Sequence, residues 1–243
     1  AKPQQLGQLN FCSDYWPGLT TGAGFLALEG SLAFVDAESG VFIVDISDPK
    51  LPKKLSYVEL PADCTALSVY DNVLYAASYD RGFIAIDVST PTAPRILGRS
   101  EDFWPTTFKD DSGWGMKVSR NVGLFIANNH AQSAETGPLA VVDLSNPQGP
   151  FNFAMVENSE TYSGSTLNAV ELYGDLAIGS FDGLFINGKW KSGGLCVFGI
   201  EDPSAPQGSY CTVTEGGYAF AMAAGELGRY HVVKDEGLSH VTL

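Results

Sequence analysis

Short runs of alternating apolar and polar residues recur along the chain and are separated by turn residues. Four of these runs pass directly into a Pro-x-x-Pro segment, at residues 40–52, 82–94, 138–150 and 194–206. The period of two and the enrichment in Val, Ile and Phe predict β-strands, whereas the prolines withhold backbone donors and fix a corner. A segment repeated in this way is typical of a repeat architecture.

Each repeat contains further strand-like runs around this segment. In the first repeat, residues 25–28 and 32–35 precede it and residues 54–60 follow it. The later repeats have matching runs upstream, at residues 66–69 and 73–77, 116–118 and 124–127, and 167–172 and 176–178. Four strands in each repeat predict the blades of a β-propeller.

The two ends of the chain complement each other. Residues 218–224, 229–233 and 237–243 supply three strands of a fifth repeat, and residues 4–9 align with the fourth strand of the other repeats. Pairing of the two ends would close a ring and leave no exposed sheet edge. We therefore predict an all-β, five-bladed β-propeller of four-stranded antiparallel blades, closed by the N-terminal strand in the C-terminal blade. The expected single domain, 1–243, divides into blades at about residues 21–60, 64–100, 113–157, 165–213, and 218–243 with 1–11.

The repeated segments, such as GVFIVDISDPKLP and GFIAIDVSTPTAP, resemble the LVIVD-repeat β-propellers of bacterial and archaeal exported or cell-surface proteins. The resemblance extends over essentially the whole chain and implies an extracytoplasmic location and an interaction role. It carries over no catalytic residues, because the shared motif is a structural strand and turn. Gly199 and Thr242 replace the motif Asp in the fourth and fifth repeats, so we expect weaker corners there.

Charge and hydropathy limit the classes of partner. The chain has 243 residues and a formal net charge of −14, from 28 acidic and 14 basic residues. This charge disfavours nucleic acid and anionic lipid, and no apolar run is long enough to span a membrane, so we expect no nucleic-acid partner and no membrane insertion. The acidity fits either solvation alone or a site for a cation or a basic partner. A start at Ala1 suits a mature exported protein and equally a trimmed chain.

The four cysteines lack the spacing of a zinc or redox motif. Cys196 and Cys211 fall on neighbouring predicted strands, almost symmetrically about their turn, so we expect a disulfide between them. Cys12 and Cys64 both follow fourth strands and are candidates for a second bridge, between neighbouring blades. Either bridge would suit an oxidising compartment, and the alternative is free buried thiols.

Long segments between the second and third strands of repeats three and four, at residues 128–136 and 181–193, indicate a binding edge. Binding groups concentrate on long loops of rigid scaffolds. All four tryptophans lie in predicted loops or connectors, where each either seals a gap between blades or anchors a partner. The residues predicted to form the binding edge are Trp104, Trp114, His130, Asp182 and Trp190.

Acidic residues at matching positions after the second strands are candidates for a cation site. If they converge, their oxygen ligands suit Ca²⁺. The alternative, which we favour, is that each carboxylate caps its own turn and that no cofactor is needed. The candidates are Glu38, Asp80, Asp182 and Glu236, with His130 at the matching position of the third repeat.

The sequence has no Gly-x-Ser-x-Gly elbow, phosphate loop or His-Glu-x-x-His helix. We therefore expect a non-catalytic, exported module that presents a propeller face to a glycan, a protein or an extracellular polymer. The alternative is a carbohydrate-active hydrolase, which needs two carboxyls about 5 to 10 Å apart at the channel mouth. Carboxylates available for that role are Asp14, Asp102, Asp110, Asp111, Glu157 and Glu160.

Overall fold

All regular structure in the described chain is β-strand. The computed structural model describes residues 2–11, 24–37, 40–61, 64–78, 82–100, 115–126, 139–156, 167–213, 219–224, 229–234 and 237–242. Within these ranges no helix is long and apolar enough to cross a membrane.

The strands form five antiparallel sheets in chain order, and consecutive strands are neighbours in every sheet. The first comprises β1 (Leu26–Glu29), β2 (Leu32–Ala37), β3 (Gly40–Asp45) and β4 (Lys53–Glu59). The second comprises β5 (Cys64–Tyr70), β6 (Val73–Ser78), β7 (Gly82–Asp87) and β8 (Arg95–Arg99). The third comprises β9 (Met116–Ser119), β10 (Val122–Ile126), β11 (Leu139–Asp143) and β12 (Asn152–Met155). The fourth comprises β13 (Leu167–Tyr173), β14 (Leu176–Ile186), β15 (Lys189–Gly199) and β16 (Gln207–Val213), and the last comprises β17 (Ala219–Ala224), β18 (Arg229–Lys234) and β19 (Gly237–Thr242).

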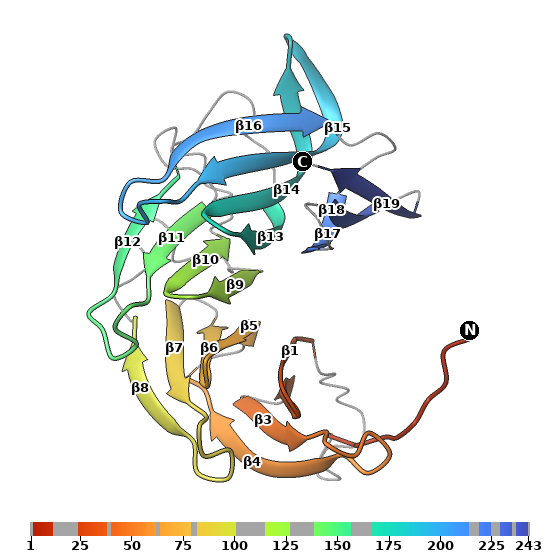
Figure 1. Ribbon diagram of the computed structural model, residues 1–243, viewed down its shortest axis with the longest axis vertical. Coiled ribbons are helices and arrows are strands. Elements are labelled where there is room, and N and C mark those ends of the chain that lie inside the picture. Colours follow the sequence, from red (N-terminus) through yellow and green to blue (C-terminus); the bar gives the residue numbers. More distant parts are fainter. Residues whose placement is uncertain are drawn as a thin grey trace.

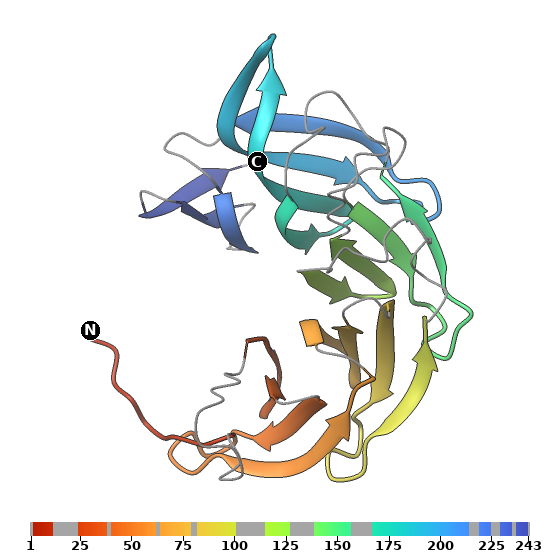
Figure 2. The same cartoon turned by 180° about the vertical axis from the view of Figure 1, so that it is seen from behind.

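The sheets stand side by side in an arc, with β5, β9 and β13 toward the inside and β4, β8 and β12 along the rim (Figure 1). The first and last sheets lie at the two ends of the arc, as the view from behind also shows (Figure 2). The predicted all-β architecture of four-stranded antiparallel sheets is therefore confirmed. The last sheet has three strands and residues 2–11 form no strand, so closure of the ring by the N-terminal segment stays a prediction.

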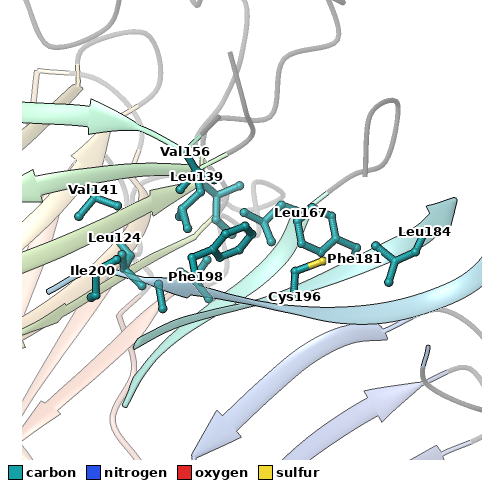
Figure 3. Packing of buried hydrophobic residues seen from close by; sticks show 13 residues of the cluster. Leu124, Leu139, Val141, Val156, Leu167, Phe181, Leu184, Cys196, Phe198 and Ile200 are labelled. Carbon is teal, nitrogen blue, oxygen red and sulfur yellow. The ribbon is translucent and has the colours of Figure 1, made fainter. Parts of the chain in front are cut away.

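Hydrophobic clusters fill the spaces between successive sheets. Phe34 and Ile43 of the first sheet pack with Leu74 and Ile86 of the second, and all four side chains are buried. Between the third and fourth sheets, Leu124 and Val141 pack in one cluster with Phe198 (Figure 3). Each inner sheet thus buries both of its faces, which explains why β7 and β11 are almost continuously apolar.

The motif glycine on the third strand of the first and fourth sheets is required by close approach of the fourth strand. A Cβ atom at Gly40 would meet the carbonyl oxygen of Val58 in β4 well inside contact distance. A Cβ at Gly194 would lie 3.0 Å from the carbonyl oxygen of Thr212 in β16. Because backbone atoms cannot move aside as a flexible side chain can, the position favours glycine.

The motif Asp closes the corner after the third strand. The Asp45 carboxylate accepts a hydrogen bond from the Ser47 backbone N–H at 2.8 Å, and the Asp87 carboxylate accepts one from Ser89 N–H at 2.9 Å. The Asp87 carboxylate also accepts a 2.6 Å hydrogen bond from Arg95. Hydrogen bonds from Ser89 and Arg95 lower the pKa of Asp87 to about 2. Asp at this position therefore fixes the turn by accepting backbone donors.

The corner of the fourth sheet lacks this first hydrogen bond because Gly199 has no side chain. A second side-chain turn follows three residues later in the same corner. It is retained, since the Asp202 carboxylate accepts a hydrogen bond from Ser204 N–H at 2.9 Å. Asp48 makes the matching bond to Lys50 N–H in the first sheet. The departure from the motif thus removes one of two consecutive side-chain turns, and the energetic weakening of this corner stays a prediction.

We predict that Gly40→Ala destabilises the protein by about 1–3 kcal/mol, because the new methyl group overpacks against the β4 backbone. Urea unfolding followed by tryptophan fluorescence measures the change. Gly199→Ala is the matched control, since a Cβ there would have its nearest neighbour, the Gln207 carbonyl oxygen, at 3.6 Å. Equal losses in the two variants would contradict the close-approach explanation.

We predict that Asp87→Asn lowers the unfolding free energy at pH 7 by about 1–2 kcal/mol, because it weakens hydrogen bonds to a charged acceptor. The folded-state pKa of Asp87 is depressed from 3.8 to about 2. Its contribution is therefore present above pH 3.8 and is lost as the pH falls toward 2. Urea titrations at pH 2, 3, 4 and 7 should show the wild-type and variant stabilities converging in acid. A difference that stays constant across this range would refute the assignment.

Candidate binding site on the β14–β15 hairpin

The longest strands of the fold form a hairpin that extends beyond its sheet. β14 and β15 pair from Leu176–Gly199 out to Ile186–Lys189. Their neighbours end earlier: β13 pairs with β14 only as far as Phe181, and β16 pairs with β15 only as far as Gly194. The remaining residues form a two-stranded ribbon that projects from the arc (Figure 1). The expectation of a loop over residues 181–193 was therefore wrong.

A two-residue turn explains why this segment is a hairpin. Asn187 has φ 53° and Gly188 has φ 73°, so both residues are left-handed. Turns with two left-handed residues match the twist of a β-hairpin, and Asn-Gly is their preferred sequence. The Asn-Gly pair, which follows the apolar run Leu184–Ile186, was the sequence signal that the loop interpretation overlooked.

An aromatic pair covers one face of the ribbon. Phe185 and Trp190 are directly opposite in the register, with ring centroids 5.6 Å apart. The Trp190 ring also lies over Gly183, where a Cβ would be 3.6 Å from its Cε3 atom. Isolated two-stranded hairpins are marginally stable, and directly opposite aromatic pairs strengthen them. Trp190 is thereby held in place while 57% of its surface remains exposed.

Leu184 anchors the other face of the ribbon in the protein core. Its side chain is fully buried in the cluster between the third and fourth sheets (Figure 3). It occupies the space that a side chain at position 194 would need, since a Cβ at Gly194 would overlap the Leu184 side chain. The hairpin is therefore fixed to the fourth sheet at its base.

Two lysines flank the exposed tryptophan. Lys189 and Lys191 are both exposed and lie on the opposite face of the ribbon from Trp190, because strand residues alternate. The sequence contains no acidic residue from Gly183 to Ile200. The end of the hairpin is therefore locally cationic in a chain with a formal net charge of −14.

The structure places two of the five predicted binding residues on this hairpin. Trp190 lies near its end, and Asp182 lies at its base, with a half-buried side chain that has an interaction partner. Trp104, Trp114 and His130 lie outside the described residues, so their expected convergence with Trp190 stays a prediction. Phe185 and Gly183, which orient Trp190, were missed because their role depends on the register of the hairpin.

The proposed cation site and the hydrolase alternative rest mostly on residues outside the described ranges. Of the candidate cation ligands, Glu38, Asp80 and Glu236 lie outside them, as do all six carboxylates named for hydrolysis. Within the described ranges, no three His, Cys, Asp or Glu side chains are grouped as metal ligands. One buried carboxylate, Glu171 on β13, already forms an ion pair at 3.0 Å with Lys117 on β9.

The expected disulfide between Cys196 and Cys211 is confirmed. The two residues are directly opposite on β15 and β16 and are bonded through sulfur. The bridge joins the strand that carries Trp190 to the outer strand of the sheet, close to the base of the projecting ribbon. It therefore adds a covalent constraint to the support of the hairpin.

The candidate second bridge, between Cys12 and Cys64, is not formed: Cys64 is a free, half-buried thiol, and Cys12 lies outside the described residues. Burial, together with the charge of Asp36, raises the pKa of the Cys64 thiol to about 12. Because only the thiolate is nucleophilic, Cys64 is a poor candidate for chemistry at neutral pH.

Comparisons with known proteins support the fold. The LVIVD repeat model matches residues 23–57 and 62–102, which cover the first two sheets. No curated protein matches the sequence significantly. Among solved structures, the computationally designed Ika4 protein is 15% identical with a TM-score of 0.52, covering 82% of this chain and 99% of its own. The designed Ika8 protein is 12% identical with a TM-score of 0.55, covering 91% and 71%.

A chain of a nidogen–laminin complex is also similar, with 8% identity and a TM-score of 0.56 over 90% of this chain and 75% of its own. Identities this low concern the fold alone. The chain therefore carries LVIVD repeats, and its four-stranded sheets have the β-propeller-like arrangement that those repeats predicted.

Proposed function

We propose that this protein is a non-catalytic, exported binding module that presents the β14–β15 hairpin to a partner outside the cytoplasm. The observation that carries the proposal is the exposed Trp190, which is held by Phe185 and Gly183 on a ribbon anchored through Leu184. Aromatic side chains fixed in advance lose little entropy on binding and supply a large contact area. A glycan, a protein or an extracellular polymer fits this kind of anchor.

The disulfide supports a location in an oxidising compartment. Disulfides persist in secreted and periplasmic proteins and are rare in the cytosol. The Cys196–Cys211 bridge is structural, since Cys196 is fully buried. The LVIVD repeats support the same location.

We further propose that the arc closes into a five-bladed ring. The support comes first from the open face of the first sheet. Leu26 and Leu28 of β1 occupy the positions of Leu67 and Val69 in β5 when the two sheets are aligned at their first turns. Leu67 is buried in the cluster between the first two sheets, whereas Leu26 and Leu28 are each 59% exposed. Burial of a leucine is worth about 1.5–3 kcal/mol, so this face favours a covering sheet.

The N-terminal segment supports closure independently, because it lies on the first sheet as β4 lies on the second. Val58 and Leu60 pack in the cluster between the first two sheets. The residues aligned with them in the N-terminal segment, Leu9 and Phe11, pack against the first sheet in the same way. The segment already contacts the first sheet as an outer strand of a preceding blade would.

The backbone of the N-terminal segment also approaches the first sheet as the backbone of a fourth strand approaches the next sheet. A Cβ at Gly98 in β8 would lie 2.8 Å from the Pro147 carbonyl oxygen in the corner of the next sheet. A Cβ at Gly7 would similarly overlap the Pro49 carbonyl oxygen in the corner of the first sheet. Gly7 aligns with Gly98, so the N-terminal segment has the register of a fourth strand. The sheet that lacks a fourth strand is β17–β19.

For the binding module, we predict that Trp190→Ala lowers the affinity at least tenfold for polysaccharides that retard the wild-type protein in affinity electrophoresis. The loss follows from removal of an anchoring aromatic side chain, typically worth 2 kcal/mol or more at a binding hot spot. Trp190→Tyr should keep part of the affinity.

The matched control is Tyr210→Ala, which removes an aromatic side chain that is 73% exposed on β16, outside the hairpin end. It should leave retardation unchanged. If Trp190→Ala and Tyr210→Ala behave alike on every polymer that binds, the hairpin is not the binding element.

For ring closure, the alignment places Gln8 opposite Ser239 of β19, as Arg99 is opposite Ile84. In a Cys12→Ser, Cys64→Ser background, Gln8→Cys with Ser239→Cys should form an intramolecular disulfide, because cross-strand Cα atoms lie within bridging distance. Mass spectrometry of proteolysed monomer detects the cross-linked peptides. Gln4→Cys with Ser239→Cys is the misaligned control and should remain reduced. Equal yields in both pairs, or no bridge in either, would rule out this register.

A further inference from the structure

The end of the β14–β15 hairpin has the opposite charge to the protein that carries it. Lys189 and Lys191 are exposed, and the sequence from Gly183 to Ile200 contains no carboxylate. The chain as a whole has twice as many acidic as basic residues, 28 against 14. The cationic segment attracts an anionic partner, whereas the acidic rest of the protein repels that partner. Contact is therefore confined to the end of the hairpin.

The projection of the ribbon places this charge at the outer edge of the protein. The last pair that other strands flank is Phe181–Gly194, and the ribbon continues for five residues to Ile186–Lys189. Leu184, opposite Lys191, is still buried in the core, so the ribbon extends beyond the body by the last two pairs only, which is about 7 Å at 3.3 Å per residue. The Debye length is about 10 Å at 0.1 M salt, so the repulsion by the body is only partly screened at the end of the hairpin.

Trp190 supplies a second kind of contact, on the opposite face of the ribbon from the lysines. Its ring lies over Gly183 on one side, and Phe185 packs at a tilt of 54° against it. The exposed ring surface suits the C–H face of a sugar ring, which is flat and weakly polar. A polymer that crosses the end of the ribbon meets Trp190 on one face, and the two lysines reach its carboxylate or sulfate groups from the other face with their flexible four-carbon stems.

We infer that the hairpin binds an anionic polysaccharide, with Trp190 stacking on sugar rings and Lys189 and Lys191 pairing with their acidic groups. This inference rests on the proposed binding function and names its ligand class. An anionic membrane is the less suitable partner, because the foremost residues of the hairpin are Asn187 and Gly188. A membrane-inserting element leads instead with apolar or aromatic side chains.

The test compares polygalacturonate with neutral dextran in affinity electrophoresis at 50 and 500 mM NaCl, using the full chain. The wild-type protein should be retarded by polygalacturonate alone, and its affinity should fall at least tenfold at the higher salt concentration. Lys189→Gln with Lys191→Gln should weaken binding at least fivefold and reduce the salt dependence. The charge-matched control, Lys50→Gln with Lys53→Gln, changes two exposed lysines of the first sheet and should bind as the wild type does.

Other outcomes overturn the inference in distinguishable ways. Equal retardation by dextran, or no retardation by polygalacturonate, excludes an anionic polysaccharide. Preferential binding to polyglutamate assigns the site to an acidic peptide, and binding only to phosphatidylglycerol vesicles assigns it to a lipid surface. If Trp190→Ala weakens dextran binding while the lysine variant does not, the binding function survives and the charge assignment fails. If Trp190→Ala changes binding to none of the probes that the wild type binds, the binding function itself fails.

Discussion

The structure depends on the need of each sheet to bury two apolar faces. The buried clusters lie between sheets rather than within them, with side chains such as Phe34 and Leu74 contributed from both sides (Figure 3 shows the cluster between the third and fourth sheets). A single four-stranded sheet of this kind cannot be stable alone, because both of its apolar faces would be exposed to water. Stacking satisfies every inner sheet and leaves the two outermost faces uncovered. A ring removes both of those faces at once.

The repeated motif is the local device that makes such stacking possible. Its glycine allows the fourth strand to approach the third, as at Gly40, and its Asp organises the corner that follows, as at Asp87. The glycine recurs in the first, second and fourth repeats, and the Asp recurs in the first three. Functional differences between the sheets therefore have to come from additions to this frame, and the β14–β15 extension is such an addition.

Local features of the fold could be predicted from the sequence, whereas features that join distant segments were predicted less well. Alternation, the Pro-x-x-Pro corners and the repeat spacing identified the sheets, and symmetry about a turn identified the Cys196–Cys211 bridge. The Cys12–Cys64 bridge was wrong because it required the relative positions of two connectors, which no local pattern specifies. The hairpin was mistaken for a loop because its length exceeded that of its counterparts, although Asn187-Gly188 encoded the turn.

The central claim is that the N-terminal segment is the fourth strand of the last blade. Its side chains Leu9 and Phe11 already lie on the first sheet in the register of an outer strand. Amide hydrogen exchange, measured by NMR on the full chain, tests the remaining step most directly. In a closed ring, the backbone N–H groups of residues 5–9 and of β19 form hydrogen bonds with each other. They then exchange as slowly as the N–H groups that are hydrogen-bonded between β3 and β4. Exchange of residues 5–9 at the rate of an unstructured peptide would contradict closure and leave the molecule an open arc.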